Sequence, residues 1–154
     1  MIKKLREVKS FEHDFVIIGA GPAGITVALE LEKYKKTVLL LEGGGLEYSK
    51  DSQSIYKGQV AGDENFSVKN SRLRYFGGSS NHWGGMCRPF SRSELSAFPI
   101  DKQDLDTHLS AACRILEISD QFKDDIKINE NFERIDFKFS PPVRFNAKYK
   151  KSIA

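Results

Sequence analysis

Short apolar runs and a segment of helical period stand near the start of this chain. Phe15–Ile18 is wholly apolar, which is typical of a strand buried on both faces in a parallel sheet. Thr37–Leu41 is β-branched at its start and apolar throughout, so it predicts a second strand. The segment between them has helical spacing and predicts a helix over residues 23–34. The apolar residues with this spacing are Ala23, Val27, Ala28 and Leu31.

The second half of the chain predicts a longer helix, a strand and the start of another helix. Residues 98–118 fit one helix with Asp101 as its N-cap and a single apolar face. That face consists of Leu105, Leu109, Ala112 and Leu116. Residues 135–139 alternate between apolar and charged side chains, which predicts a strand with one buried face. Residues 144–151 begin another helix.

Polar stretches separate these elements. Residues 1–13 are expected to form a loosely held lead-in, and residues 46–71 an irregular excursion with a short strand near Val60. Residues 119–130 are charged and predict a loop.

The turn after the first strand carries three glycines in the G-x-G-x-x-G spacing. Gly19 allows a tight turn, Gly21 lets the backbone approach a pyrophosphate, and Gly24 lets the helix pack close to the strand. Pro22 stands near the helix start, where its missing N–H costs nothing. The free N–H groups of the first helical turn would face phosphates. The pattern therefore favours dinucleotide binding over a βαβ unit whose glycines only turn the chain.

An acid ends the second strand. Glu42 stands eighteen residues after Gly24, where a carboxylate can accept hydrogen bonds from a ribose hydroxyl. An acid at this place disfavours a 2′-phosphate, which leaves NAD or the ADP half of FAD. Gly43–Gly45 follow at once and are expected to clear space beside the adenosine.

A second dense patch covers residues 71–90. Four glycines bracket two serines, an asparagine, a histidine and Trp83, the only tryptophan of the chain. This composition suits a loop against a flat, polar-edged ligand, with exposed backbone N–H groups, short donors and an aromatic wall. The alternative is a glycine-rich turn over the core that Trp83 anchors.

Length, charge and cysteine content narrow the class of protein. The 154 residues predict one domain, and the net charge of +3 is spread evenly over both halves, which gives nucleic-acid binding little support. No apolar run approaches the roughly 18 residues that span a bilayer, and no signal peptide is evident. Cys87 and Cys113 are expected to be reduced thiols in a cytoplasmic protein, without a metal site. His13 and His108 are expected to be solvated.

Three blocks of the chain resemble the N-terminal part of the glucose–methanol–choline (GMC) flavoprotein oxidoreductases. The first is Asp14–Gly24 with Glu42, and many flavin and NAD enzymes share it. The second, Arg72–Pro89, is the specific one. The third combines Phe98–Ile100 with Phe139–Phe145. The blocks follow the family's order and span nearly the whole chain.

The resemblance implies an α/β chain with a Rossmann-like, incomplete FAD-binding βαβ fold. Residues 1–13 would be a lead-in and residues 14–154 the N-terminal part of the FAD domain. The residues that this resemblance and the motifs assign to FAD are Gly19, Gly21, Pro22, Ala23, Gly24, Glu42, Gly43, Arg74, Gly78, Ser79, Asn81, His82, Gly84 and Gly85.

One histidine is also a candidate for a covalent bond. The run from Ser80 to Trp83 is similar to the Ser-Thr-His-Trp of pyranose 2-oxidase-like members, with Asn81 in place of threonine. In those enzymes the histidine is linked to the flavin's 8α-methyl group. The resemblance therefore makes His82 a candidate flavinylation site.

The family oxidises CH–OH groups of sugars and other alcohols by hydride transfer to the flavin. Its base is a histidine near the C-terminus, paired with a second histidine or an asparagine. None of the three histidines of this chain belongs to that pair, so we expect no catalytic residue here and a fragment that binds FAD weakly or not at all. The alternatives are an NAD-binding Rossmann domain of another oxidoreductase and a non-catalytic dinucleotide-binding remnant.

Overall fold

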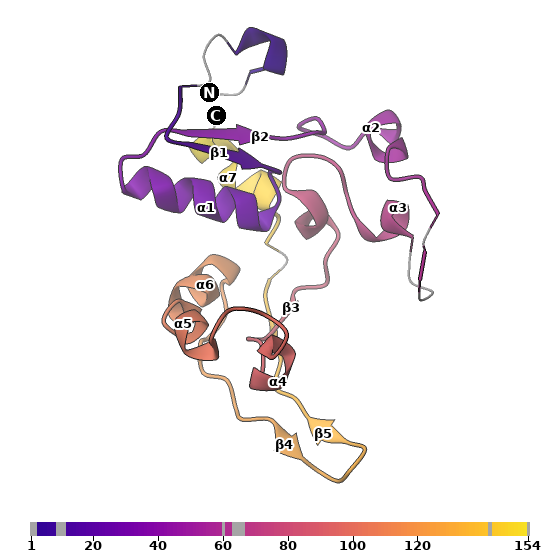
Figure 1. Ribbon diagram of the computed structural model, residues 1–154, viewed down its shortest axis with the longest axis vertical. Helices are drawn as coiled ribbons and strands as arrows, with labels where there is room; N and C mark the ends of the chain where they lie inside the picture. Colours follow the sequence, from indigo (N-terminus) through magenta and orange to yellow (C-terminus); the bar gives the residue numbers. More distant parts are fainter. Residues whose placement is uncertain (1–2, 9–11, 60, 63–66, 142, 154) are drawn as a thin grey trace. The chain divides into compact units, whose positions relative to one another are not determined.

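The computed structural model describes residues 3–8, 12–59, 61–62, 67–141 and 143–153 (Figure 1). These residues form a mixed α/β structure with one small parallel sheet and two small antiparallel sheets. The chain divides into two compact units, where its length alone predicts one domain. The first unit combines Met1–His82 with Arg144–Ala154, and the second is Trp83–Val143.

The first unit is built on a strand–helix–strand unit. β1 (Phe15–Ile18) and β2 (Val38–Leu41) pair in parallel, with Phe15 opposite Val38 and Ile18 opposite Leu41. α1 (Pro22–Lys33) connects them, as a parallel pair requires a crossover, and it packs against both strands (Figure 1). These elements confirm the sequence prediction to within one residue at each end.

The burial of these elements differs from the prediction. β1 is not buried on both faces, because Val16 is 50% and Ile18 86% exposed. The described part of this sheet has only two strands, so the apolar run has more surface than its neighbours cover. On α1 the core residues are Ile25, fully buried, and Ala28, whereas Val27 is 48% exposed.

Besides η2 (Gly78–Asn81), described below, the described part of the first unit contains three short helices that the sequence pattern did not predict. They are η1 (Leu5–Glu7), α2 (Lys50–Ser54) and α3 (Val68–Ser71). α2 begins after Ser49, whose hydroxyl accepts the Ser52 N–H at 3.4 Å, and such a cap overrides the polar composition of this stretch. The strand expected near Val60 lies outside the described residues.

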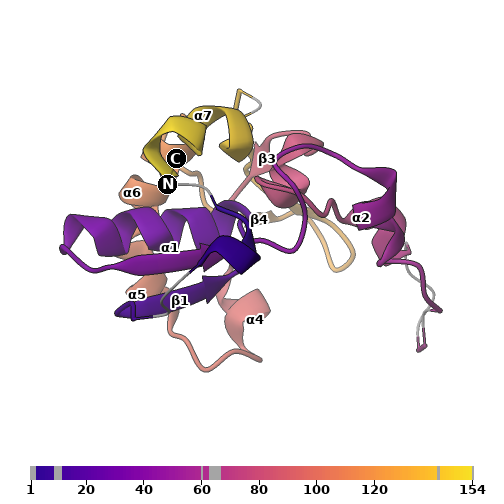
Figure 2. The ribbon, with the colours of Figure 1, turned by 90° about the horizontal axis from the view of Figure 1, so that it is seen from above.

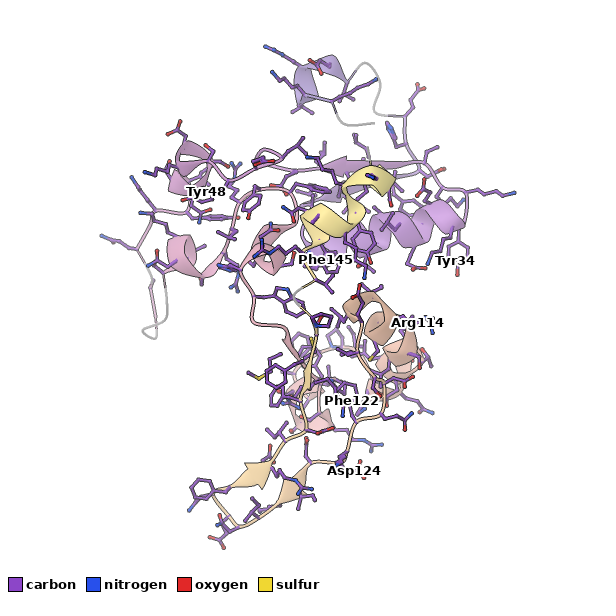
Figure 3. All side chains as sticks on the ribbon, turned by 180° about the vertical axis from the view of Figure 1, so that it is seen from behind. Tyr34, Tyr48, Arg114, Phe122, Asp124 and Phe145 are labelled. Carbon is purple, nitrogen blue, oxygen red and sulfur yellow. The ribbon has the colours of Figure 1, made fainter. Side chains whose placement is uncertain are left out.

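The end of the chain returns to the first unit as α7 (Phe145–Ile153), close to the predicted helix over 144–151. α7 packs against α1 and against η2 (Gly78–Asn81) (Figure 2). Phe145, labelled in Figure 3, is only 2% exposed and anchors this helix in the unit.

The second unit combines short strands with three helices. β3 (Met86–Cys87) pairs antiparallel with β6 (Lys138–Phe139), and β4 (Ile126–Lys127) with β5 (Glu133–Arg134). The helices are α4 (Arg92–Leu95), α5 (Lys102–Asp106) and α6 (Leu109–Leu116). β4 lies in the stretch that predicted only a loop.

The helix expected over residues 98–118 is two helices. α5 ends at Asp106, followed by Thr107, whose hydroxyl donates to the Asp104 carbonyl at 2.7 Å, and α6 begins after His108. The predicted face is right in part, because Leu109 and Leu116 are half-buried whereas Leu105 is exposed. Ala112 is exposed, and Cys113, 3% exposed, is the buried residue of α6.

The strand expected over residues 135–139 was also wrong in length and burial. Only its last two residues pair with β3, and Phe137 and Phe139 are 38% and 69% exposed. The charged residues Asp136 and Lys138 are half-buried instead. The Asp136 carboxylate accepts the Lys123 N–H at 3.0 Å and pairs with Lys138 at 3.2 Å.

Candidate functional site

A different structural feature explains each of the three glycines of the first turn. Gly19 has φ +101°, a left-handed conformation that other residues rarely adopt. A Cβ at Gly24 would lie 2.0 Å from the Gly19 carbonyl oxygen, so only glycine lets α1 pack this close. A Cβ at Gly21 would meet nothing within 4 Å, which leaves the backbone there open to approach. The turn expected at Gly19 and the close helix packing expected at Gly24 therefore agree with the local geometry.

The start of α1 is open as well. Pro22 is its first residue, as predicted, and Gly21 is its N-cap, so no side chain caps the first turn. The N–H groups of Ala23 and Gly24 therefore lie at the positive end of the helix dipole, and no side chain accepts a hydrogen bond from them. This arrangement suits an anion.

Glu42 joins the ends of β1 and β2. One of its carboxylate oxygens accepts the Ala20 N–H at 2.9 Å, and the other accepts the Gly44 N–H at 2.7 Å. Each carboxylate oxygen has a second lone pair, so Glu42 keeps acceptor capacity for a ligand hydroxyl. The backbone bonds are a structural role that the sequence pattern did not reveal.

The second glycine-rich loop lies directly against the first. The Gly77 N–H donates to the Ala20 carbonyl at 2.8 Å, and the Phe76 N–H donates to the Gly45 carbonyl at 2.9 Å. A Cβ at Gly78 would lie 3.3 Å from the Gly21 Cα. Two motifs far apart in the sequence thus meet in one unit.

The second loop is not wholly irregular, because it contains η2 and leads into β3. Its short polar side chains hold its own backbone. The Ser79 hydroxyl accepts the Leu73 N–H at 3.2 Å, and the Ser80 hydroxyl donates to the Gly77 carbonyl at 2.7 Å. The Asn81 amide donates to the carbonyls of Phe76 and Gly78, at 3.1 and 3.0 Å.

One atom of this loop is buried without a partner. The Oδ1 of Asn81 has no hydrogen bond among the described residues, although its amide nitrogen makes two. A buried acceptor without a donor is costly, so this oxygen is a place where a bound donor would stabilise the structure.

His82 and Trp83 belong to different units. The His82 side chain is exposed, and its backbone N–H donates to the Ser79 carbonyl at 3.2 Å. Trp83 is half-buried, and its indole N–H donates to the Val143 carbonyl at 3.2 Å within the second unit. The indole N–H is therefore used inside the protein, as expected for an anchor.

Gly84 and Gly85 also belong to the second unit, so the cluster built in the first unit contains neither. Gly85 has φ +79°, and a Cβ there would lie 2.4 Å from the Ser140 carbonyl oxygen. The Gly85 carbonyl in turn accepts the Ser140 N–H at 2.7 Å. This glycine is required by the packing of β3 against β6.

Arg74 corrects the expectation for the glycines after Glu42. A Cβ at Gly43 would lie 2.5 Å from an Arg74 guanidinium nitrogen, and one at Gly44 would lie 2.1 Å from the Arg74 carbonyl oxygen. The space that Gly43 and Gly44 leave is therefore filled by Arg74 rather than left open for a ligand. Ser52 and Gln53 hold this arginine, and the sequence analysis missed both because a buried glutamine in a polar stretch gives no periodic signal.

The described histidines and cysteines lie in different surroundings. His108 is exposed, as expected, but His13 is half-buried with its Nδ1 buried and without a hydrogen bond. Cys87 and Cys113 are free thiols, as expected, and burial raises the pKa of each. The described residues contain no cluster of three metal-ligating side chains and no helix long and apolar enough to cross a membrane.

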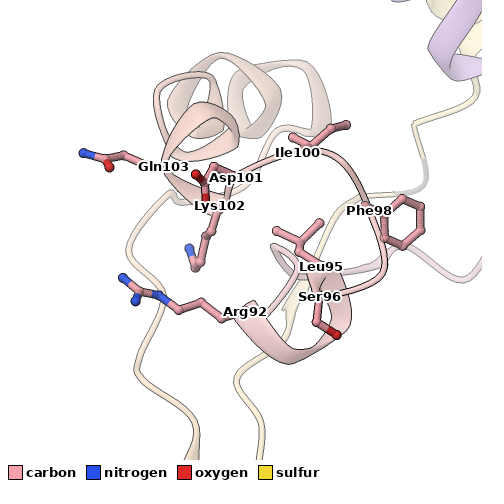
Figure 4. Close-up of a pocket in the computed structure, with 8 residues that line it drawn as sticks. All are labelled: Arg92, Leu95, Ser96, Phe98, Ile100, Asp101, Lys102 and Gln103. Atoms are coloured by element: carbon pink, nitrogen blue, oxygen red, sulfur yellow. The ribbon is translucent and has the colours of Figure 1, made fainter.

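The second unit has one open hollow of about 410 Å³ between α4 and α5 (Figure 4). Its lining residues are Arg92, Leu95, Ser96, Phe98, Ile100, Asp101, Lys102 and Gln103. Lys102 is already paired with Asp106 at 2.6 Å. The hollow contains none of the residues that the sequence assigns to a cofactor.

Comparison with known proteins adds no relative to this picture. No family model matches the chain, and no curated protein matches it.

Proposed function

We propose that this chain is the FAD-binding portion of an oxidoreductase that oxidises CH–OH groups of a sugar or another alcohol. The observation that carries the proposal is the docking of the second glycine-rich loop on the first, through the Gly77 N–H and the Ala20 carbonyl at 2.8 Å. A generic dinucleotide turn does not require a second glycine-rich loop beside it. A second loop with exposed backbone N–H groups and short donors suits a ligand with an ADP half and a flat, polar-edged half.

The residues of the first unit fit such a ligand. The open backbone at Gly21 and the uncapped start of α1 suit a pyrophosphate, and the spare lone pairs of Glu42 suit a ribose. The unpartnered Oδ1 of Asn81 suits a donor of the flavin ring. These features support a Rossmann-like FAD domain of the GMC type.

We assign the ADP half to Gly19–Gly24, Glu42, Gly43 and Arg74. The flavin half falls to Gly78, Ser79, Asn81 and His82, which all belong to the first unit. The exposed imidazole of His82 is the candidate for a covalent link. FAD, when bound, supplies the hydride acceptor of the reaction, while the residues of this chain bind and orient it.

The test is a titration of the ¹⁵N-labelled 154-residue chain with ADP, FMN, FAD and NAD at millimolar concentration, followed by NMR. We expect weak binding in which ADP and FAD move the amide signals of residues 19–24 and 42–44. FAD should also move those of residues 77–82, whereas FMN should leave residues 19–24 unmoved. The control is Gly21→Val, which should fold normally, because nothing lies within 4 Å of its Cβ position, and should lose both responses.

Two results would overturn the proposal. One is the absence of any localised change with ADP and FAD. The other is a response to NAD at concentrations at least tenfold below those needed for FAD, which would favour an NAD-binding domain.

A further inference from the structure

Gln53 is a buried polar residue whose side-chain amide makes all of its described hydrogen bonds to one segment of backbone. It lies in α2 and is 4% exposed. Its amide nitrogen donates to the carbonyls of Lys69 and Arg72, both at 2.7 Å, and its oxygen accepts the Arg74 N–H at 3.1 Å. One planar amide thus ties three points of the segment 69–74.

The preceding residue of α2 completes the arrangement. The Ser52 hydroxyl donates to the Arg74 carbonyl at 3.0 Å, and it accepts a guanidinium N–H of Arg74 at 2.9 Å. Two consecutive residues therefore hold the backbone N–H, the carbonyl and the side chain of Arg74. Such complete satisfaction of buried polar groups makes the position of Arg74 specific.

Among the described residues, no acidic side chain pairs with the guanidinium so held. Arg74 is half-buried, and the ion pairs among the described residues do not include it. It packs over Gly43, directly after the carboxyl end of β2 and Glu42. A partly desolvated guanidinium without a carboxylate is complementary to a phosphate, which it can bind through two N–H groups.

We infer that Gln53 is a positioning residue that aims Arg74 at a phosphate group of the bound dinucleotide. The inference rests on the proposed function, because it needs a ligand with an ADP half. Glutamine suits the task because it brings two donors and one acceptor on one plane. Glutamate has the same length but lacks both donors, and asparagine is one methylene shorter.

The test is a double-mutant cycle on the affinity for ADP, measured by NMR titration of the 154-residue chain. Gln53→Ala should weaken ADP binding by about tenfold in the wild-type background. The reason is that Arg74 would no longer be held in place to donate its hydrogen bond to the charged phosphate. In the Arg74→Ala background, the same substitution should change the affinity less than twofold. A residue that merely stabilised the unit would weaken binding equally in both backgrounds.

Two conservative variants and one control accompany the cycle. Gln53→Glu and Gln53→Asn should each reproduce most of the loss, because neither can bond all three backbone groups. Ser54→Ala is the matched control on the same helix, since its hydroxyl bonds only to the Asp51 carbonyl, at 2.7 Å, and it should leave ADP affinity unchanged. If Gln53→Ala does not fold, the cycle is read from the Glu and Asn variants.

Equal losses in both backgrounds, or a folded Gln53 variant with unchanged ADP affinity, would overturn this inference and leave the proposed function intact. A wild-type chain without any response to ADP would instead overturn the proposed function, and this inference with it.

Discussion

Asp14 and Thr37 fasten the amino ends of β1 and β2 by reciprocal hydrogen bonds. The Asp14 carboxylate accepts the Thr37 N–H at 2.8 Å and the Thr37 hydroxyl at 2.9 Å, while the Asp14 N–H donates to that hydroxyl oxygen at 2.9 Å. The backbone bond from Thr37 contributes most to lowering the pKa of Asp14, followed by the hydroxyl. This contact therefore depends on an ionised carboxylate.

The first prediction is an acid-sensitive stability that comes from Asp14. Its folded pKa is lower than the unfolded value of 3.8, so its contribution is complete above pH 3.8 and is lost as the pH falls through the folded pKa. Asp14→Asn should lower the free energy of unfolding at neutral pH and flatten its decline in acid. Urea unfolding across this pH range measures both effects. The exposed Asp124→Asn is the control, and parallel profiles for Asp14→Asn and wild type would contradict the prediction.

The second prediction concerns the two thiols. Burial raises the pKa of both, and the nearby Asp120 carboxylate raises that of Cys113 further. Since the thiolate is the reactive form, both thiols should react more slowly with iodoacetamide at neutral pH than those of the unfolded chain, with Cys113 the slower. Mass spectrometry of time points gives the rates. Equal rates in folded and urea-unfolded protein would show that the burial is not as described.

At the scale of elements, the strand–helix–strand unit was predictable because its signals agree locally. The apolar runs, the glycine spacing and Pro22 each specify the same boundaries. The break between α5 and α6 was not predictable from apolar spacing, because a side-chain bond from Thr107 to the Asp104 carbonyl ends the first helix. The apolar spacing continues across the break, so it predicted one helix where the structure has two.

The third prediction separates the two helix-start glycines. Gly24→Ala places a Cβ 2.0 Å from the Gly19 carbonyl oxygen, and such overpacking typically costs about 1–3 kcal/mol of unfolding free energy. Gly21→Ala meets nothing within 4 Å and should change stability by less than about 0.5 kcal/mol. Chemical denaturation of both variants checks this. Equal destabilisation would contradict the close packing of α1 on the turn.

At the scale of the whole molecule, many large apolar side chains remain exposed. Ile18 is 86%, Phe139 69% and Phe132 67% exposed, and the strands of the described sheets are short. Exposed apolar residues beside open strand edges favour association between chains. The alternation of residues along a strand predicts which face is apolar, but whether anything covers that face depends on distant segments. The burial of β1 was therefore the least predictable property of the fold.

The fourth prediction follows from the exposure of β1. Ile18→Lys should reduce self-association and the binding of a hydrophobic dye, without loss of unfolding free energy, because the side chain is 86% exposed. Light scattering and dye fluorescence at matched concentrations measure this. Tyr34→Lys is the control, since Tyr34 is 75% exposed and is the C-cap of α1 rather than a residue of the strand (Figure 3). An equal effect of both substitutions would argue against β1 as the cause.

The candidate site shows the same division between local and distant causes. The roles of Gly19 and Gly24 were predictable because each concerns a few neighbouring residues. The packing of Arg74 over Gly43 was not, because the residues that bond Arg74, Ser52 and Gln53, lie far from it in the sequence.

The contact between the two glycine-rich loops has a consequence for how the chain tolerates change. Gly45 and Tyr75 form a parallel bridge, and the Phe76 N–H donates to the Gly45 carbonyl at 2.9 Å. These bonds close residues 46–74 into a loop whose two ends meet beside the first turn. A flexible loop loses only about 0.6 kcal/mol of closure free energy for each doubling of its length. Insertions into residues 46–74 should therefore cost little stability, provided that they lie well away from α2 and from residues 69–74. Residues 46–74 are thus the segment in which the length of the chain can change while the contacts of the two glycine-rich loops stay the same.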